Sequence, residues 1–269
     1  MSETFPNLYI SRNKVVNRRN LTKMHYHDEH ELYYLLSGNT KYFIKDEIFS
    51  LSKGDFIFIP KNTLHKTDSD ECLNNERILI SINDSLITPE LEPVLEDLSN
   101  KKLIGISEYK LAPLEDILFK IEAEYMSNNN HKFIMINTYI IQLMTLLSRY
   151  ARNPKTKISP TDKLMTDIAV YISKNFSNKI TLEGLCEEFN VSKSYLSRQF
   201  KSSCGIGINE YLTGIRISAA EKLLANKKYS ITDIALKCGY NDSNYFAAVF
   251  KKYKGVTPLK FSKEIDKNR

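Results

Sequence analysis

The sequence predicts a two-domain α+β protein, with an N-terminal antiparallel β-barrel and helical segment, then a C-terminal all-α domain that contains two helix-turn-helix units. Three observations predict this class. Short apolar stretches follow one another over residues 24–83, helical periodicity replaces them from residue 114, and one helical pattern occurs twice near the C-terminus. The chain of 269 residues is long enough for two domains, since domains of roughly 100–150 residues are the commonest.

The first domain is expected over residues 1–150, and its N-terminal half reads as strands. Its apolar stretches are MHYHDEHELYYLLS, KYFIKDEIFSL, GDFIFIP and RILISIN. Gly38, Gly54 and Pro60 separate them, and these residue types commonly end strands. Closely spaced short strands are typical of a small antiparallel barrel.

Two helical stretches follow the strands, Leu114–Met126 and Phe133–Arg149. The second carries apolar residues at helical spacing, which indicates either packing in the core or a dimer interface. Its members are Ile136, Ile140, Leu143, Met144 and Leu147. We therefore expect a homodimer joined through this segment. The polar residues 151–158 are the predicted linker.

The second domain is expected over residues 159–269 as a series of short helices. Pro160 opens the first helix, because proline is favoured at the first helical position. Four hydroxyl residues can cap later helices: Thr181, Ser192, Ser230 and Thr257. Asn190 and Gly239 lie between consecutive helices, where a tight turn needs left-handed backbone.

Residues 181–203 and 230–253 form an internal duplication. The two copies align at an offset of 49 residues before the turn and 50 after it, because the second turn is one residue longer. Each copy reads as a short helix, a tight turn and a second helix with apolar residues on one face. This pattern predicts a helix-turn-helix unit in each copy.

The net charge of +6 is unevenly distributed along the chain. Residues 1–150 hold 17 Lys and Arg against 21 Asp and Glu, a net charge of −4. Residues 151–269 hold 21 against 11, a net charge of +10. A positive excess on duplicated helical units is typical of a nucleic-acid-binding domain, so double-stranded DNA is the expected partner.

The C-terminal residues also carry the motifs of a known family. These are YLSRQFK at 195–201, ITDIALKCGY at 231–240, FKK at 250–252 and GVTP at 255–258. Over about residues 160–263 the chain resembles the AraC/XylS family of bacterial transcription regulators. The resemblance implies a regulator that is not an enzyme, in which the second helix of each unit enters the major groove of DNA.

The outward faces of the two second helices supply the candidate DNA contacts. Arg198 is the best candidate for reading guanine, because its planar guanidinium can donate two hydrogen bonds to O6 and N7. The alternatives for this residue are a phosphate contact and a plain surface charge. The second reading helix offers only Asn244 as a bidentate group, so we expect it to rely more on backbone contacts and shape. The full set is Lys193, Ser194, Ser197, Arg198, Lys201, Ser243, Asn244, Ala247 and Lys251.

Four of the five histidines lie among the first predicted strands. The spacing of His25, His27 and Glu31, with His65 further on, resembles the two motifs of a cupin barrel. Alternate residues of a continuous strand point to one face, so His25, His27 and Glu31 are expected to converge. His65 would arrive from a neighbouring strand, whereas His30 would point to the opposite face.

Two ligand classes suit these residues. Three imidazoles and one carboxylate, from His25, His27, His65 and Glu31, can bind a divalent transition metal such as Mn, Fe, Ni or Zn. The other class is an organic effector, and a sugar is favoured because it is a common effector in the resembling family. The same four residues and Tyr33 would then bind it, with Tyr42 and Phe58 as aromatic neighbours.

We therefore predict a cytoplasmic, ligand-responsive transcription regulator that contacts RNA polymerase if it is an activator. No apolar run approaches the ~18 residues of a membrane span, and the N-terminus lacks a signal-peptide pattern. The four cysteines are widely spaced, which indicates neither a disulfide framework nor a cysteine zinc site. Two alternatives stay open: a regulator that senses a metal ion itself, and a cupin metalloenzyme such as a dioxygenase with a DNA-binding appendage.

Overall fold

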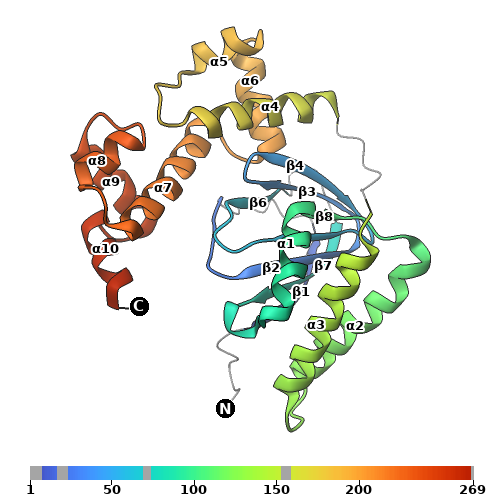
Figure 1. Cartoon of the computed structure of the whole chain (residues 1–269). Helices are drawn as coiled ribbons and strands as arrows, with labels where there is room; N and C mark the ends of the chain where they lie inside the picture. The colour runs from blue at the N-terminus through green and yellow to red at the C-terminus, as the bar shows by residue number, and fades with distance from the viewer. Residues whose placement is uncertain (1–7, 17–23, 69–73, 153–158, 268–269) are drawn as a thin grey trace. The chain divides into compact units, whose positions relative to one another are not determined.

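The computed structural model describes residues 8–16, 24–68, 74–152 and 159–267 (Figure 1). The described residues up to Ser159 form mainly one compact unit, and those from Pro160 form mainly a second. Most of the predicted linker, residues 153–158, lies outside the described residues. In the part of the chain that the structure describes, no helix is long and apolar enough to cross a membrane.

The first unit contains two antiparallel sheets. One has the strand order β1-β7-β2-β5-β8 and the other the order β4-β3-β6. The strands are β1 (Leu8–Val16), β2 (His30–Ser37), β3 (Asn39–Ile44), β4 (Glu47–Ser52), β5 (Phe56–Ile59), β6 (His65–Asp68), β7 (Asn74–Ile82) and β8 (Leu103–Ile104). The prediction missed β1, which pairs with β7 along its whole length and buries Leu8 and Ile10 on one side.

Alternation along β2 divides the apolar residues of the first unit into two layers. Leu32 and Tyr34 pack with the helices, whereas Tyr33 and Leu35 pack between the two sheets with Tyr42 of β3. The side of the five-stranded sheet that carries Tyr33 and Leu35 is called the inner face below. Successive side chains of a strand point to opposite faces of the sheet. Only every second residue of a strand can therefore contact a ligand inside the barrel.

Three helices cover the opposite face of that sheet (Figure 1). They are α1 (Glu92–Lys101), α2 (Glu108–Met126) and α3 (Lys132–Tyr150), and two short 3-10 turns, Asp84–Leu86 and Pro89–Leu91, precede them. The predicted apolar stripe of α3 is buried in the core against the sheet and α2. The stripe is therefore core, and it is not available as a dimer interface.

The described part of the second unit is helical. Its elements are α4 (Pro160–Asn175), α5 (Leu182–Phe189), α6 (Lys193–Cys204), α7 (Ile208–Asn226), α8 (Ile231–Lys237), α9 (Ser243–Lys254) and α10 (Pro258–Lys267). The pairs α5–α6 and α8–α9 are the two helix-turn-helix units, here called the first and second units of DNA reading. This confirms the predicted fold class for the C-terminal part.

Local signals account for the ends of these helices. Thr181, Ser192 and Ser230 accept hydrogen bonds from backbone N–H groups of the first turn, as predicted. Asn190 and Gly239 adopt left-handed backbone, with φ of 51° and 80°. The prediction did not include Asp242, whose side chain accepts N–H bonds at the start of α9. The negative charge of an aspartate at this position also interacts favourably with the positive end of the helix dipole.

Candidate functional site: DNA-reading helices and a histidine cluster

Helix α6 presents the predicted DNA contacts to solvent. Leu196 and Phe200 are fully buried, which orients the helix and leaves the opposite face exposed. The exposed residues include all five predicted on this helix: Lys193, Ser194, Ser197, Arg198 and Lys201. Lys193 donates a hydrogen bond to Glu183 over 2.6 Å, so its charge is partly neutralised. Arg198 has no ion-pair partner among the residues that the structure describes.

Helix α9 is oriented in the same way by Phe246 and Phe250, which are fully buried. Asn244 and Lys251 are exposed, whereas Ser243 and Ala247 are half-buried and less available than predicted. Sequence reasoning also missed an aromatic side chain on this helix: Tyr245 is 64% exposed. Its position directly before a buried phenylalanine was the only signal, because neighbours in sequence point in different directions on a helix.

Arg216 of α7 joins the two units of DNA reading. Its Nε donates to the carbonyl oxygen of Phe176 over 2.9 Å, and its Nη2 donates to that of Asn178 over 3.0 Å. Both carbonyls belong to the segment between α4 and α5. The guanidinium carbon lies 5.2 Å from the ring centroid of Tyr240, in the turn of the second unit. One side chain thus fixes the turn between α8 and α9 against the segment that leads into α5.

Gly239 precedes Tyr240 in this turn and lies close to both Arg216 and the Phe176 carbonyl. A Cβ atom built on it would lie 2.7 Å from the Phe176 carbonyl oxygen and 2.7 Å from Arg216 Nη2. The backbone φ of 80° is also one that other residues rarely adopt. Glycine is therefore required at this position for two reasons. The turn needs its backbone conformation, and the Phe176 carbonyl and Arg216 lie too close for a side chain.

The candidate sensor site begins where two histidines pair through their backbones. His25 N–H donates to the His65 carbonyl over 3.1 Å, and His65 N–H donates to the His25 carbonyl over 2.9 Å. His27 follows in the loop before β2. The ring centroids lie 4.4 Å apart for His25 and His65 and 5.1 Å apart for His27 and His65. One nitrogen from each ring lies within 4.8 Å of the other two.

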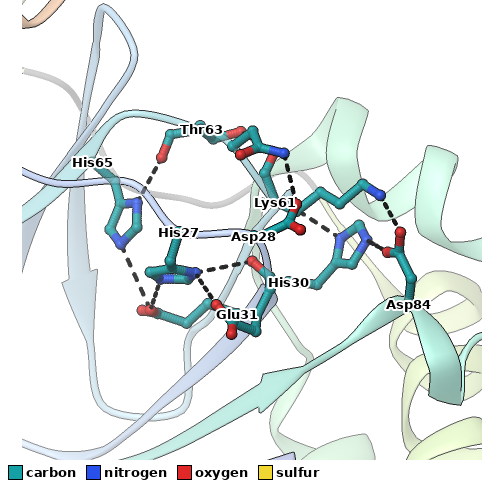
Figure 2. Close-up of polar contacts among 10 residues, drawn as sticks. His27, Asp28, His30, Glu31, Lys61, Thr63, His65 and Asp84 are labelled. Atoms are coloured by element: carbon teal, nitrogen blue, oxygen red, sulfur yellow. Dashed lines mark hydrogen bonds and ion pairs between the residues drawn. The ribbon is translucent and has the colours of Figure 1, made fainter. Parts of the chain in front are cut away.

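Glu31, the second residue of β2, completes this cluster (Figure 2). Its Oε2 lies 3.2 Å from His27 Nε2 and 3.6 Å from His65 Nε2. Burial raises the pKa of this carboxyl, but the two imidazoles outweigh burial and lower the pKa to about 2. The hydrogen bond that the protonated His27 ring donates to Glu31 raises the pKa of His27 above its ordinary value. The cluster therefore holds a carboxylate at neutral pH.

Backbone carbonyls orient two of the rings. Nδ1 of His27 lies 3.0 Å from the Glu29 carbonyl, and Nδ1 of His65 lies 2.7 Å from the Thr63 carbonyl. A carbonyl only accepts, so each Nδ1 donates its hydrogen and each Nε2 faces Glu31. His65 is 1% exposed, and its Nε2 has no hydrogen-bond partner. This is the orientation that outer carbonyls impose on metal-binding histidines, so the residues present fit a divalent transition metal.

The predicted reason for this convergence was wrong. Strand β2 begins only at His30, and residues 26–29 form a loop that is not paired in a sheet. The backbone bridge of His25 to His65 brings the rings together, not a shared face of one strand. His30 points away from the cluster to Asp84, with 3.4 Å between Nε2 and Oδ1 (Figure 2).

The structure divides the predicted aromatic neighbours. Tyr33 on the inner face contacts Tyr42 of the three-stranded sheet, with ring centroids 4.8 Å apart. Phe58 was wrongly predicted to join them, because it has the other parity and packs with the helices and His30. Sequence reasoning also missed Asn75 and Arg77, which share the inner face of β7 with Leu79. The guanidinium carbon of Arg77 lies 5.8 Å from the Tyr33 ring centroid.

Comparison with known proteins agrees with both halves of this description. A helix-turn-helix domain family matches residues 185–264, and a cupin domain family matches residues 18–71. The protein is thus a DNA-binding transcription regulator with a cupin sensor domain. The chain belongs to the AraC/XylS family.

Similar proteins are found along most of the chain. The HTH-type transcriptional activator RhaR of Mannheimia succiniciproducens is 26% identical over 238 residues, which cover 88% of this chain and 86% of that protein. RhaR of Escherichia coli O139:H28 is 27% identical over 243 residues, covering 87% and 84%. The C-terminal domain of AraT, a response regulator from Geobacillus stearothermophilus, is a solved structure with 37% identity. It covers 40% of this chain and 88% of that chain, with a TM-score of 0.38.

Proposed function

We propose that the protein is a non-enzymatic activator of transcription that responds to a carbohydrate bound on the inner face of its barrel. The observation that carries the sensor part is the convergence of three imidazoles and the Glu31 carboxylate next to Tyr33. Activation is supported by the relatives, which are named transcriptional activators. An activator of this kind would contact RNA polymerase, and a homodimer would place two DNA-binding domains on paired sites.

A carbohydrate suits this set of side chains for a chemical reason. Sugar hydroxyls both donate and accept hydrogen bonds, and the cluster offers imidazole nitrogens beside a carboxylate. The ring of Tyr33 is fully buried against Tyr42, so its hydroxyl group is the part of this side chain that can contact a ligand. These groups come from β2, β6 and the loop before β2, so a ligand would connect both sheets of the barrel.

A metal-dependent or metal-sensing regulator is the second candidate, and the buried Nε2 of His65 favours it. His25, His27, His65 and Glu31 would hold the ion. A bound divalent ion would supply Lewis acidity or a fixed positive charge beneath an effector. The cupin metalloenzyme with a DNA-binding appendage would use the same four ligands, and substrate turnover would distinguish it.

We expect His65→Ala to remove the ligand response of the full-length protein. The wild type should unfold at a higher temperature with the correct sugar or metal, because a ligand at 100 times its Kd stabilises by about 2.7 kcal/mol. Thermal unfolding with sugars, divalent metals and a chelator measures this. His30→Ala is the matched control, since His30 points away from the cluster.

The chelator separates the two candidates. If a metal is required, chelation lowers the unfolding temperature of the wild type and leaves His65→Ala unchanged. If the effector is purely organic, the sugar response survives chelation. A normal response of His65→Ala to both ligand classes would contradict the proposed site.

For DNA binding, we expect Arg198→Ala and Lys251→Ala to differ in kind. Arg198→Ala should cost about 1–3 kcal/mol on the preferred sequence and relax the choice at one base pair, because a bidentate contact to guanine is lost. Lys251→Ala should weaken all sequences about equally, as loss of a phosphate contact does. Binding to a set of single-base operator variants measures both. Equal effects of the two substitutions on every sequence would contradict base reading by Arg198.

A homodimer also needs an exposed surface, and the buried stripe of α3 does not provide it. Apolar side chains are exposed where α2 ends and α3 begins, on either side of the turn at 127–131. We name these residues the hairpin patch: Met126, Phe133, Ile134 and Met135. An exposed apolar cluster on a soluble protein is a common mark of association. The hairpin patch is thus our candidate for the dimer contact.

A further inference from the structure

We propose that the effector is a sugar acid, and that Arg77 and Asn75 of β7 bind its carboxylate. The inference rests on the proposed function, because it takes the inner face of the barrel as the effector site. It adds a second recognition element at a distance from the histidine cluster, and it names the chemical class of the ligand.

The position of these two residues follows from the pairing of β7. Arg77 lies opposite Leu35 of β2, and Leu79 lies opposite Tyr33. Leu35, Tyr33 and Leu79 all pack between the two sheets. Asn75 and Arg77 have the same parity as Leu79, so they also point to the inner face. The Arg77 guanidinium carbon lies 5.8 Å from the Tyr33 ring centroid, which agrees with this orientation.

Both residues carry buried polar atoms that make no hydrogen bond. Asn75 is 2% exposed, and neither its amide nitrogen nor its amide oxygen has a partner. Nη1 of Arg77 is enclosed and also has none. Buried polar groups are satisfied in the large majority of cases, and an unsatisfied one destabilises the fold. Two such residues side by side on one face therefore indicate a place where a ligand supplies the missing partners.

The charge of the set selects the ligand. Arg77 is half-buried on the inner face and has no carboxylate partner within the described residues. A carboxylate has two acceptor oxygens and can take parallel hydrogen bonds from a guanidinium, while the Asn75 amide can donate a further one. A carboxylate matches the single positive charge, whereas a phosphate would carry a charge of about −1.5 to −2. A neutral hydroxyl would leave the guanidinium charge unbalanced.

The distance to the histidine cluster fits a ligand with an acid at one end. Glu31 lies opposite Ser81, and Leu35 lies opposite Arg77, so four residues of β2 separate the two polar groups. This separation is about 13 Å along the strand. Tyr33 lies between them. An acidic sugar would thus direct its carboxylate to Arg77 and its hydroxyl groups toward the histidines.

Matched pairs of sugars test this in the full-length protein. Glucuronate differs from glucose, and galacturonate from galactose, by one carboxylate group. Glucose 6-phosphate carries a phosphate group instead. We expect a uronate to raise the unfolding temperature at a concentration where its neutral partner does not. In calorimetric titration, Arg77→Met should raise the Kd for that uronate about tenfold or more, because a charge-assisted hydrogen bond is lost.

The variants without ligand distinguish recognition from a structural role. If Arg77 serves a ligand, Arg77→Met should unfold at the same or a higher temperature than the wild type, because an unsatisfied donor is removed. Asn75→Asp offers an internal carboxylate on the same face, so it should raise the unfolding temperature and abolish the uronate response. A lower unfolding temperature for both variants would show a structural role and overturn the proposal.

The remaining outcomes separate this inference from the proposed function. Equal stabilisation by a uronate and its neutral partner, unchanged in Arg77→Met, overturns the acid assignment and leaves carbohydrate sensing in place. Preference for glucose 6-phosphate, or no shift with either uronate, also overturns it. A uronate that binds through Arg77 but leaves operator binding unchanged supports this inference and contradicts the proposed regulatory role.

Discussion

Gly239→Ala is expected to destroy operator binding by the second unit of DNA reading and to destabilise its domain. A left-handed conformation costs a residue with a side chain about 1–3 kcal/mol. The added Cβ would also lie 2.7 Å from the Phe176 carbonyl oxygen, which is backbone and cannot move aside easily. Either the turn shifts or Arg216 loses its position, and both results change the angle between α6 and α9. Operator binding and thermal unfolding of the full-length protein measure the effect.

Gly255→Ala is the matched control for that experiment. Its φ of 77° gives a similar conformational cost, but nothing lies within 4 Å of the added Cβ atom. We therefore expect Gly255→Ala to lower stability moderately and to leave operator binding nearly intact. If Gly239→Ala bound operator DNA as well as Gly255→Ala does, the contact with Phe176 and Arg216 would not position the second unit.

Leu143→Asp should unfold the sensor unit. Leu143 of α3 is 0% exposed and packs in the core against α2 and the sheet. Truncating a buried leucine to alanine alone costs about 2–5 kcal/mol, and an aspartate adds the cost of a buried charge without a partner. Total stabilities of domains are about 5–15 kcal/mol, so a loss of this size is large. Circular dichroism and thermal unfolding should show loss of the β-rich unit.

Ile134→Asp on the same helix tests association without unfolding. Ile134 is 62% exposed in the hairpin patch, so the substitution should leave the unfolding temperature of a dilute sample nearly unchanged. If the hairpin patch joins the homodimer, sedimentation should show a monomer, and binding to paired operator sites should weaken as the effective concentration falls. A stable dimer of Ile134→Asp would place the interface elsewhere.

Several elements were predictable because their signals are local. Thr181, Ser192 and Ser230 cap helices through hydrogen bonds that reach only three residues along the chain. The second helices were predicted from the spacing of Leu196 and Phe200 and of their repeats. Strand β1 escaped detection because the polar run at residues 11–14 interrupts its apolar residues, and its pairing partners in β7 lie 58 to 74 residues away in the sequence.

The histidine cluster shows an intermediate case. Motif spacing named the correct four residues for a common location, but the argument from a continuous strand was wrong because the chain loops at 26–29. Pairing of His25 with His65, forty residues apart, brings the rings together. Phe58 was misplaced for the related reason that the face of β5 depends on its register with β2.

By itself, the sequence determined the two-domain class, the duplicated helix-turn-helix pattern, the basic second half and the histidine motif. Each depends on residue type and on spacing within a short segment, which the chain carries whatever its tertiary structure. Only the tertiary structure decided that the α3 stripe is core, that Arg216 and Gly239 join the two units of DNA reading, and that Arg77 faces Tyr33. These depend on packing between segments distant in sequence, where strand register and helix orientation select which side chains meet.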